Sequence, residues 1–218
     1  LIYSIAEIDK IKRIRFMTSH PRDMTDELIK AFGTIPKLMP FLHLPVQSGS
    51  NRILKSMNRG HIVEEYVEII NKLRYVRKDI CFSSDFIVGY PGETDKDFQE
   101  TIDLCEKVQF SQAYSFNYSS RPGTPASRKE DLDENLKKTR LHILQDLLNK
   151  QQTTFLKEQK NRKHKVLFEK IGRGIDEYVG RTEQFSPVTV VSKENIVGEI
   201  RSVKINSVMS HSLKGVLK

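Results

Sequence analysis

Cysteine and histidine most often hold metals and clusters, and their spacing in this 218-residue chain does not suit that role. Only two cysteines occur, Cys81 and Cys105, and they form no CxxC unit. An iron–sulfur cluster needs several thiolate ligands, usually close together. His20, His43 and His61 lack the spacing of a zinc site and have no nucleophile beside them. We therefore predict no metal site and no catalytic nucleophile, and expect both thiols to be core residues in a reducing compartment.

The segment SDFIVGYPGET (84–94) is the strongest local signal for ligand binding. It has the pattern of a strand, a tight turn and a helix start. Gly89 and Gly92 allow a ligand to approach the backbone closely, and amides at a helix start can bind an anionic group. Asp85 and Glu93 can accept hydrogen bonds from ribose hydroxyls or an amine. The alternative is an ordinary turn between a strand and a helix.

Two further loops carry polar side chains that suit a ligand. In HLPVQSGS (43–50), Gln47 and Ser48 offer donors and acceptors. The alternative here is that Ser50 only caps the next helix. Arg121, in the loop SSRPGTPAS, is suited to a phosphate or a carboxylate, or to an ion pair within the loop.

The pattern of apolar residues indicates how these loops are held. Strands are expected at 14–18, 41–44, 81–88 and 113–118, with helical segments between them. Thr25 or Asp23 can cap the first long helix, and Thr94 with Asp97 has capping-box spacing. Strands that alternate with helices predict a parallel sheet of the α/β class. Because ligands bind at the carboxyl ends of such strands, we expect one rim to gather four loops, SHPRD, PVQSGS, GYPGET and SSRPGTP.

The pattern changes after a long charged helix expected at 132–160. About five short β-rich runs follow, which predict a small all-β barrel. We therefore divide the chain into residues 1–160 and 161–218. Basic residues alternate with apolar ones in the second part, which is typical either of a nucleic-acid platform or of a solvated surface: Arg181, Lys193, Arg201, Lys204 and Lys214.

The composition is that of a soluble, core-forming chain. The formal net charge is +8 and the pI about 9.4, so phosphate-bearing partners fit. The longest apolar runs are too short to span a bilayer and no secretory signal is visible, so we expect a cytoplasmic protein without a membrane partner. The chain begins at Leu1 with what reads as the end of a helix running into a strand. This beginning favours a truncated sequence or a trimmed one.

Several passages, taken together and in order, resemble the methylthiotransferase branch of the radical-SAM superfamily. They are MTSHPRD, FLHLPVQSGSNRILKSMNRG, SSDFIVGYPGETDKDF, YSFNYSSRPGTPA, and GRTEQFSPVTVV with GEIRSVKI. The resemblance covers essentially the whole chain and is greatest to members that modify prenylated adenosine in tRNA. It implies the carboxyl-terminal part of a partial (β/α) radical-SAM barrel. The last segment resembles the small RNA-binding TRAM barrel, which is OB-like.

The resemblance also implies cofactors, a substrate and site residues. Members of the family use four-iron–four-sulfur clusters and S-adenosylmethionine to attach a methylthio group to an adenosine beside the anticodon, so the expected partner is a tRNA anticodon stem-loop. The superfamily's GxIxGxxxE motif has Asp85 in place of its first glycine. The residues expected on the cofactor side are Gln47, Ser48, Asp85, Ile87, Gly89, Glu93 and Arg121, and those expected on the RNA side are Arg181, Lys193, Arg201 and Lys204.

One departure from the family is large, because the CxxxCxxC loop that ligates the radical-generating cluster is absent. We therefore expect this chain alone to be inactive and the edge of its sheet to be open. It would be a fragment, a decayed product, or one half of a split enzyme whose separate N-terminal half carries the cysteines. The alternative functions are a non-catalytic RNA-binding remnant and a sister enzyme acting on threonylcarbamoyl-adenosine.

Overall fold

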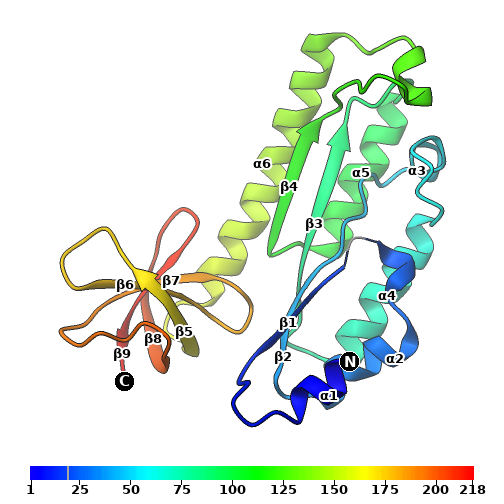
Figure 1. Ribbon diagram of the computed structural model, residues 1–218. Coiled ribbons are helices and arrows are strands. Elements are labelled where there is room, and N and C mark those ends of the chain that lie inside the picture. Colours follow the sequence, from blue (N-terminus) through cyan, green and yellow to red (C-terminus); the bar gives the residue numbers. More distant parts are fainter. Residues whose placement is uncertain (19) are drawn as a thin grey trace.

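The computed structural model describes residues 1–18 and 20–218, in two parts joined by one long helix (Figure 1). The first part is a four-stranded sheet with helices, and the second is a closed five-stranded barrel. The joining helix, α6, spans Glu134–Glu158. Ser19, in the expected SHPRD loop, lies outside the described residues.

The sheet is parallel throughout, as predicted, in the order β1-β2-β3-β4. The strands are β1 (Ile14–Met17), β2 (Leu38–His43), β3 (Cys81–Val88) and β4 (Gln112–Asn117). The β2 strand begins at Leu38, earlier than the expected position 41, because the amide of Ile14 already donates to the Lys37 carbonyl at 2.7 Å. This ladder aligns the carboxyl ends of β3 and β4 at one rim.

Helices cover one face of the sheet and leave the other largely uncovered (Figure 1). On the covered face, Phe82, Phe86 and Val88 of β3 are fully buried among helix side chains. The helices are α1 (Ile2–Ala6), α2 (Asp26–Thr34), α3 (Asn51–Ser56), α4 (Val63–Val76) and α5 (Asp95–Val108), with short 3₁₀ turns at Pro21–Asp23 and Pro125–Arg128. Within the described residues, none of these helices or α6 has the length and hydrophobicity to span a bilayer.

Two predicted helix caps are confirmed, and a third residue, Ser50, holds the predicted cap position without forming the side-chain bond. The hydroxyl of Thr25 accepts from the Leu28 amide, and Thr94 forms a reciprocal capping box with Asp97. Ser50 occupies the position before α3, but its hydroxyl donates to Asp97 Oδ1 at 2.7 Å instead of capping that helix. The cap was mispredicted because the acceptor comes from a helix far along the chain.

The second part closes as β5-β6-β7-β9-β8 around its own core of apolar side chains, which includes Val166, Phe168 and Val203. Its strands are β5 (Lys163–Ile171), β6 (Glu177–Arg181), β7 (Pro187–Val191), β8 (Ile200–Val208) and β9 (Leu213–Leu217). The predicted small all-β barrel is therefore present.

Two arginines join the barrel to the first strand of the sheet. Arg13 donates to the carbonyls of Arg181 and Lys165 at 3.0 and 2.7 Å. Arg15 donates to the carbonyls of Thr182 and Glu183 at 2.8 and 3.2 Å. These four bonds place the barrel beside the uncovered face of the sheet.

Asp97 stabilises the start of α5 through several charged and neutral donors. Its carboxylate, which is almost fully buried, pairs with Arg52 and accepts from the hydroxyls of Ser50 and Thr94. Burial alone would raise the pKa of Asp97, but the hydrogen bonds from Arg52, Thr94 and Ser50 outweigh it and lower that pKa. The charged form therefore stabilises the fold at neutral pH.

Replacing Asp97 with Asn should lower the free energy of unfolding at pH 7 by about 2 kcal/mol, because charge-assisted bonds are lost. In the unfolded chain the Asp97 carboxyl has a pKa of about 3.9. In the folded chain its pKa is lower. The contribution is thus complete above about pH 4 and disappears as the pH falls below it. Urea unfolding followed by circular dichroism, at pH 7 and at a pH well below about 4, measures this pH dependence. Asp103→Asn, at an exposed position of the same helix, is the matched control, and an equal effect of Asp97→Asn at both pH values would contradict the assignment.

Candidate cofactor and RNA site

The rim loop after β2 is hydrogen-bonded to β3. The Gln47 amide donates to the Asp85 carbonyl at 2.9 Å, and the Ile87 amide donates to the Gln47 carbonyl at 2.9 Å. Gln47 has a φ of 77°, which is uncommon for a residue other than glycine. The structure thus brings together three residues that the sequence placed on the cofactor side.

Asp85 and Ile87 point to the uncovered face of the sheet, since the side chains between them point to the helices. Across the ladder, Asp85 lies opposite Tyr114 and Ile87 opposite Phe116. The Asp85 carboxylate lies 3.4 Å from Nε2 of His43, whose Nδ1 lies 3.0 Å from the Ser83 hydroxyl. This face therefore combines exposed aromatic rings with one polar pair.

The side chain of Glu93 points into the protein interior. Its Oε2 accepts from the Gly89 amide and from Arg140 of α6, each at 2.8 Å, and both members of the Glu93–Arg140 pair are buried. Burial raises the pKa of Glu93, against the opposing effects of the Gly89 amide and the Arg140 guanidinium. Oε1 has no hydrogen-bond partner among the described residues. Glu93 thus fixes the turn through one oxygen, while the other oxygen is buried without a partner, and its cofactor role stays a prediction.

Gly89 is required both by its backbone conformation and by its contact with α6. Its φ is +71°, and a Cβ there would lie 2.4 Å from Cγ of Lys137. The Lys137 ammonium pairs with Asp131 at 2.8 Å and with Glu134. Lys137 and Arg140 were missed by the sequence analysis, although both fall on the buried stripe of α6 with Leu144.

Ser48 lies behind the rim. Its hydroxyl is fully buried, 3.4 Å from the Thr101 hydroxyl, and accepts from the Ser50 amide at 3.1 Å. Gly49 passes so close to α5 that a Cβ would lie 2.3 Å from the Glu100 carbonyl. The cofactor role predicted for Ser48 stays a prediction, and its observed contacts support the loop.

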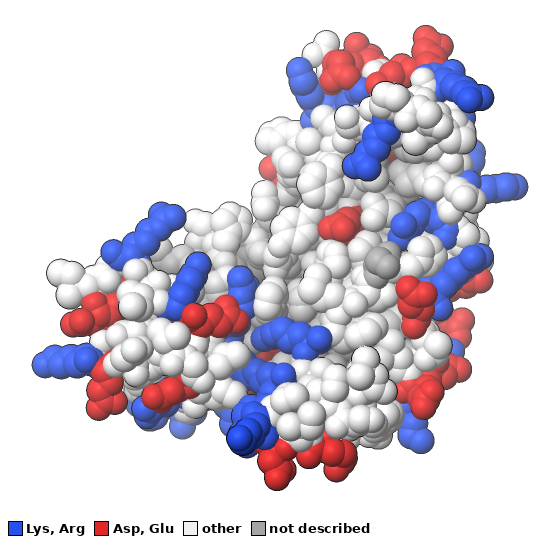
Figure 2. All heavy atoms as spheres, in the orientation of Figure 1, with Lys and Arg blue, Asp and Glu red and all other residues white. Residues whose placement is uncertain are grey.

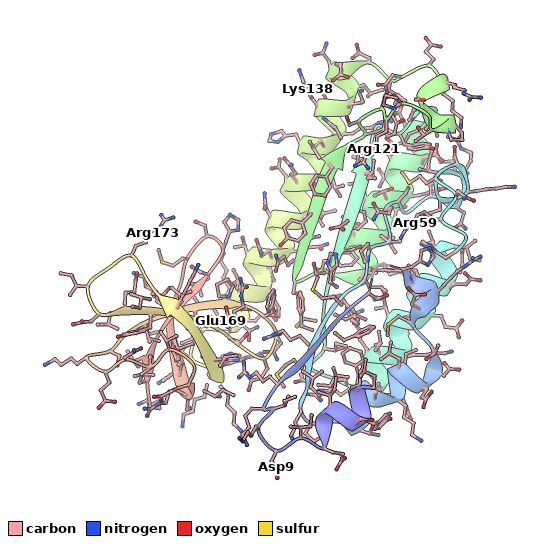
Figure 3. The ribbon with its side chains drawn as sticks, in the orientation of Figure 1. Asp9, Arg59, Arg121, Lys138, Glu169 and Arg173 are labelled. Atoms are coloured by element: carbon pink, nitrogen blue, oxygen red, sulfur yellow. The ribbon has the colours of Figure 1, made fainter. Side chains whose placement is uncertain are left out.

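Arg121 lies in the loop that follows β4, at the end of the sheet away from the barrel (Figure 3). Its side chain is exposed, and its carbonyl accepts from the Thr124 hydroxyl at 2.9 Å. The structure therefore puts Arg121 on the same rim as the Gly89 turn, and its cofactor role stays a prediction.

The two cysteines do not fit an iron–sulfur cluster. Cys105 is fully buried on α5, and burial raises its pKa. Burial also raises the pKa of Cys81, to about 12. Both thiols are therefore protonated at neutral pH, whereas cluster ligands are thiolates. Within the described residues no three His, Cys, Asp or Glu side chains are grouped so as to hold a metal ion.

The basic residues predicted for RNA do not form one group. Arg181 lies at the junction with the sheet, its guanidinium 4.0 Å from the centre of the Phe185 ring, and Arg201 pairs with Glu199 at 2.5 Å. Lys193 and Lys204 are exposed. On the face that Figure 2 shows, basic and acidic side chains are interspersed over the barrel.

One group of lysines does share an outer face. Lys204 lies between the buried Val203 and Ile205, so its side chain points outward. Directly opposite it on β5 is Lys163, and Lys214 of the adjoining strand β9 is also exposed. Like charges placed directly opposite each other destabilise a sheet. We call Lys163, Lys204 and Lys214 the lysine face.

Replacing Arg140 with Met should lower the free energy of unfolding by about 3–5 kcal/mol, because it leaves the Glu93 charge buried and unpaired. The double variant Glu93→Gln with Arg140→Met should recover most of the loss. Because the chain has no tryptophan, circular dichroism in urea is the appropriate readout. The control Lys138→Met changes an exposed residue of the same helix and should shift stability by less than about 0.5 kcal/mol. Equal losses in the single and double variants would refute the pairing.

Known proteins of similar sequence and fold agree on one superfamily. The sequence profile described as the Radical SAM superfamily matches residues 1–105. Coproporphyrinogen III oxidase (HemN) from Escherichia coli, described as a radical SAM enzyme, superposes with a TM-score of 0.54 over 92% of this chain and 50% of its own. At 14% identity this likeness supports the fold alone.

Much closer sequences are the proteins named tRNA-2-methylthio-N(6)-dimethylallyladenosine synthase. That of Bartonella tribocorum is 52% identical over 99% of this chain and 47% of its own, and that of Rickettsia felis 51% over 99% and 49%. That of Maricaulis maris is 50% identical over the whole chain and 48% of its own. The chain thus spans about half the length of these relatives. Residues 1–105 match the radical-SAM superfamily profile, and throughout its length the chain is similar to part of these synthases.

Proposed function

We propose that the chain is part of a tRNA methylthiotransferase that acts on adenosine bearing a dimethylallyl group. The observation that carries this proposal is the identity of 50–52% over 99–100% of the chain to synthases named for that product. The rim loops that carry the resemblance also lie together at the carboxyl ends of β2, β3 and β4. The chain spans about half of those relatives, so the complete activity requires residues beyond these 218.

On the cofactor side, we propose that S-adenosylmethionine binds along the end of β3. Bound there, it supplies a 5′-deoxyadenosyl radical in one role and a methyl group in another. The buried Oε1 of Glu93, which has no hydrogen-bond partner among the described residues, supports this position. The bonds between Gln47 and β3 hold the facing loop in place, and Arg121 supplies a positive charge on the same rim.

The iron–sulfur clusters need ligands that these residues do not supply. Two protonated, separated thiols cannot replace several thiolates. We therefore propose that the cysteines come from a separate segment or chain equivalent to the other half of the relatives. The chain alone should then carry no cluster and catalyse no methylthiolation.

This proposal predicts the outcome of anaerobic reconstitution. Incubated with iron and sulfide, the chain alone should bind no stoichiometric iron–sulfur and yield no methylthio-adenosine. Reconstituted with the complementary half of a relative such as that of Rickettsia felis, it should yield methylthiolated tRNA, detected by nucleoside mass spectrometry. A stoichiometric cluster on the chain alone would contradict the proposal.

We further propose that the small barrel is TRAM-like and binds the anticodon stem-loop of tRNA through the lysine face, in the cytoplasm. Two opposed lysines with a third on the next strand place three positive charges on the outside of the barrel, which suits phosphates. Lys193 and the paired Arg201 lie elsewhere on the barrel and would add weaker contacts.

The double variant Lys163→Glu with Lys204→Glu should bind an anticodon stem-loop at least about tenfold more weakly than the unaltered chain, since each phosphate contact adds to the salt-dependent affinity. Fluorescence anisotropy at several salt concentrations should also give a shallower salt dependence. Lys30→Glu with Lys78→Glu changes the net charge equally, at exposed positions outside the barrel, and serves as the control. Equal losses in both double variants would show that net charge, and not the lysine face, determines binding.

A further inference from the structure

Arg140 of α6 contacts the turn after β3 at three acceptors. Its Nη1 donates to the Glu93 carbonyl at 3.0 Å and to Glu93 Oε2 at 2.8 Å, and its Nη2 donates to Asp95 Oδ1 at 2.6 Å. The side chains of Arg140 and Glu93 are only 4% and 1% exposed, whereas that of Asp95 is exposed. A single buried guanidinium thus holds both the main chain and the side chains of this turn.

The two oxygens of the Glu93 carboxylate differ in their surroundings. Oε2 accepts from the Gly89 amide and from Arg140. Oε1 is buried and has no hydrogen-bond partner among the described residues. Buried polar atoms are normally hydrogen-bonded, and a carboxylate oxygen can only accept. The group that completes this site is therefore a hydrogen-bond donor from outside the described residues.

Arg140 is the only cation that pairs with Glu93 within the described part of the chain. Lys137, which is also buried on α6, is paired with acidic residues of its own segment instead. Asp97 of α5 acts against Arg140, because its negative charge disfavours a second carboxylate nearby, although Asp97 is itself paired with Arg52. The ionised form of Glu93 therefore depends on Arg140.

The pKa of Glu93 reflects the same balance. Burial raises this pKa, and the Gly89 amide and the Arg140 guanidinium oppose the rise. Without Arg140 one of the two opposing effects is lost, so the pKa of Glu93 must lie higher. Buried glutamates can reach pKa values of about 8–9. Glu93 would then be protonated at neutral pH and would lose the charge that strengthens the hydrogen bonds it accepts.

Building on the proposed cofactor site, we propose that Arg140 is a positioning residue for S-adenosylmethionine: it holds Glu93 through Oε2 as a carboxylate, so that Oε1 accepts from a donor group of the cofactor. S-adenosylmethionine carries such donors in its ammonium group, its ribose hydroxyls and its adenine amine. Arg140 itself is enclosed by Glu93, Asp95 and the ring of Phe98, so it acts through Glu93 and not by a contact of its own.

The binding of S-adenosylhomocysteine at several pH values tests this role. This probe has the same donor groups as S-adenosylmethionine and is not cleaved. The chain is reconstituted with the complementary half of the Rickettsia felis relative, and the affinity is measured by equilibrium dialysis. Arg140→Met should weaken binding at least about tenfold at about pH 6.5, and most of this loss should disappear by about pH 9 as Glu93 ionises. The unaltered protein, measured over the same range, corrects for titration of the probe.

Two further variants separate this role from a general loss of structure. Arg140→Lys retains a positive charge beside Glu93, so any loss of affinity should not vary with pH. Glu93→Gln keeps an acceptor for the Gly89 amide but presents an amide donor in place of the second oxygen, so it should weaken binding at least about tenfold at every pH. Lys138→Met, at an exposed position of the same helix, is the matched control for Arg140→Met and should leave the affinity unchanged.

A loss in Arg140→Met that is the same at every pH, or full affinity in Glu93→Gln, would overturn the inference. If Arg140→Met does not fold, Glu93→Gln and Arg140→Lys decide the question in the same way. Failure of the proposed function has a different signature. If the unaltered reconstituted protein binds no S-adenosylhomocysteine, the proposed cofactor site fails and this inference fails with it. If that protein binds the probe and the variants bind it equally well, only the role of Arg140 fails.

Discussion

The buried pair of Glu93 and Arg140 connects the turn after β3 with the long helix α6. A charge removed from water at this depth is tolerated only because its partner lies 2.8 Å away. Gly89 donates to the same carboxylate oxygen, so the conformation of the turn depends on the pair as well. Because α6 runs from this turn to the barrel, one ion pair fixes the start of the element that joins both parts (Figure 1).

The two faces of the sheet have different roles. Its helix-covered face carries the core that stabilises the fold, with Phe82 and Phe86 fully buried. Its uncovered face carries Asp85, Ile87 and the exposed rings of β4. Strand alternation alone produces this separation, because neighbouring residues of β3 point to opposite faces. A change on the uncovered face therefore has little effect on the core.

The sequence predicted what depends on local patterns. The parallel sheet, the capping box at Thr94 and the small barrel follow from periodicity, helix caps and strand spacing, and all are present. The role of the Ser50 hydroxyl was mispredicted, and Arg140 was missed, because their partners lie far along the chain. The position of Phe185 could not be predicted either, since contacts from separate parts of the fold determine it.

The residues expected on the cofactor side show the same difference between local and long-range contacts. Gln47, Asp85 and Ile87 were expected together on the cofactor side from the family resemblance, and the structure joins them by main-chain bonds. Ser48 carries the same polar chemistry in the sequence, yet its hydroxyl is buried against α5. Burial of a side chain in a loop depends on what packs behind it, and composition does not reveal that.

The junction between sheet and barrel has a consequence for how such proteins diversify. Arg13 and Arg15 donate to carbonyl oxygens of the barrel, which every residue type possesses. The side chains of Lys165 and Glu183, which are not buried, are thus free to change without loss of those bonds, whereas Thr182 is buried. The surface of the barrel can therefore be remodelled while Arg13, just before β1, and Arg15, within β1, continue to hold a barrel of the same backbone.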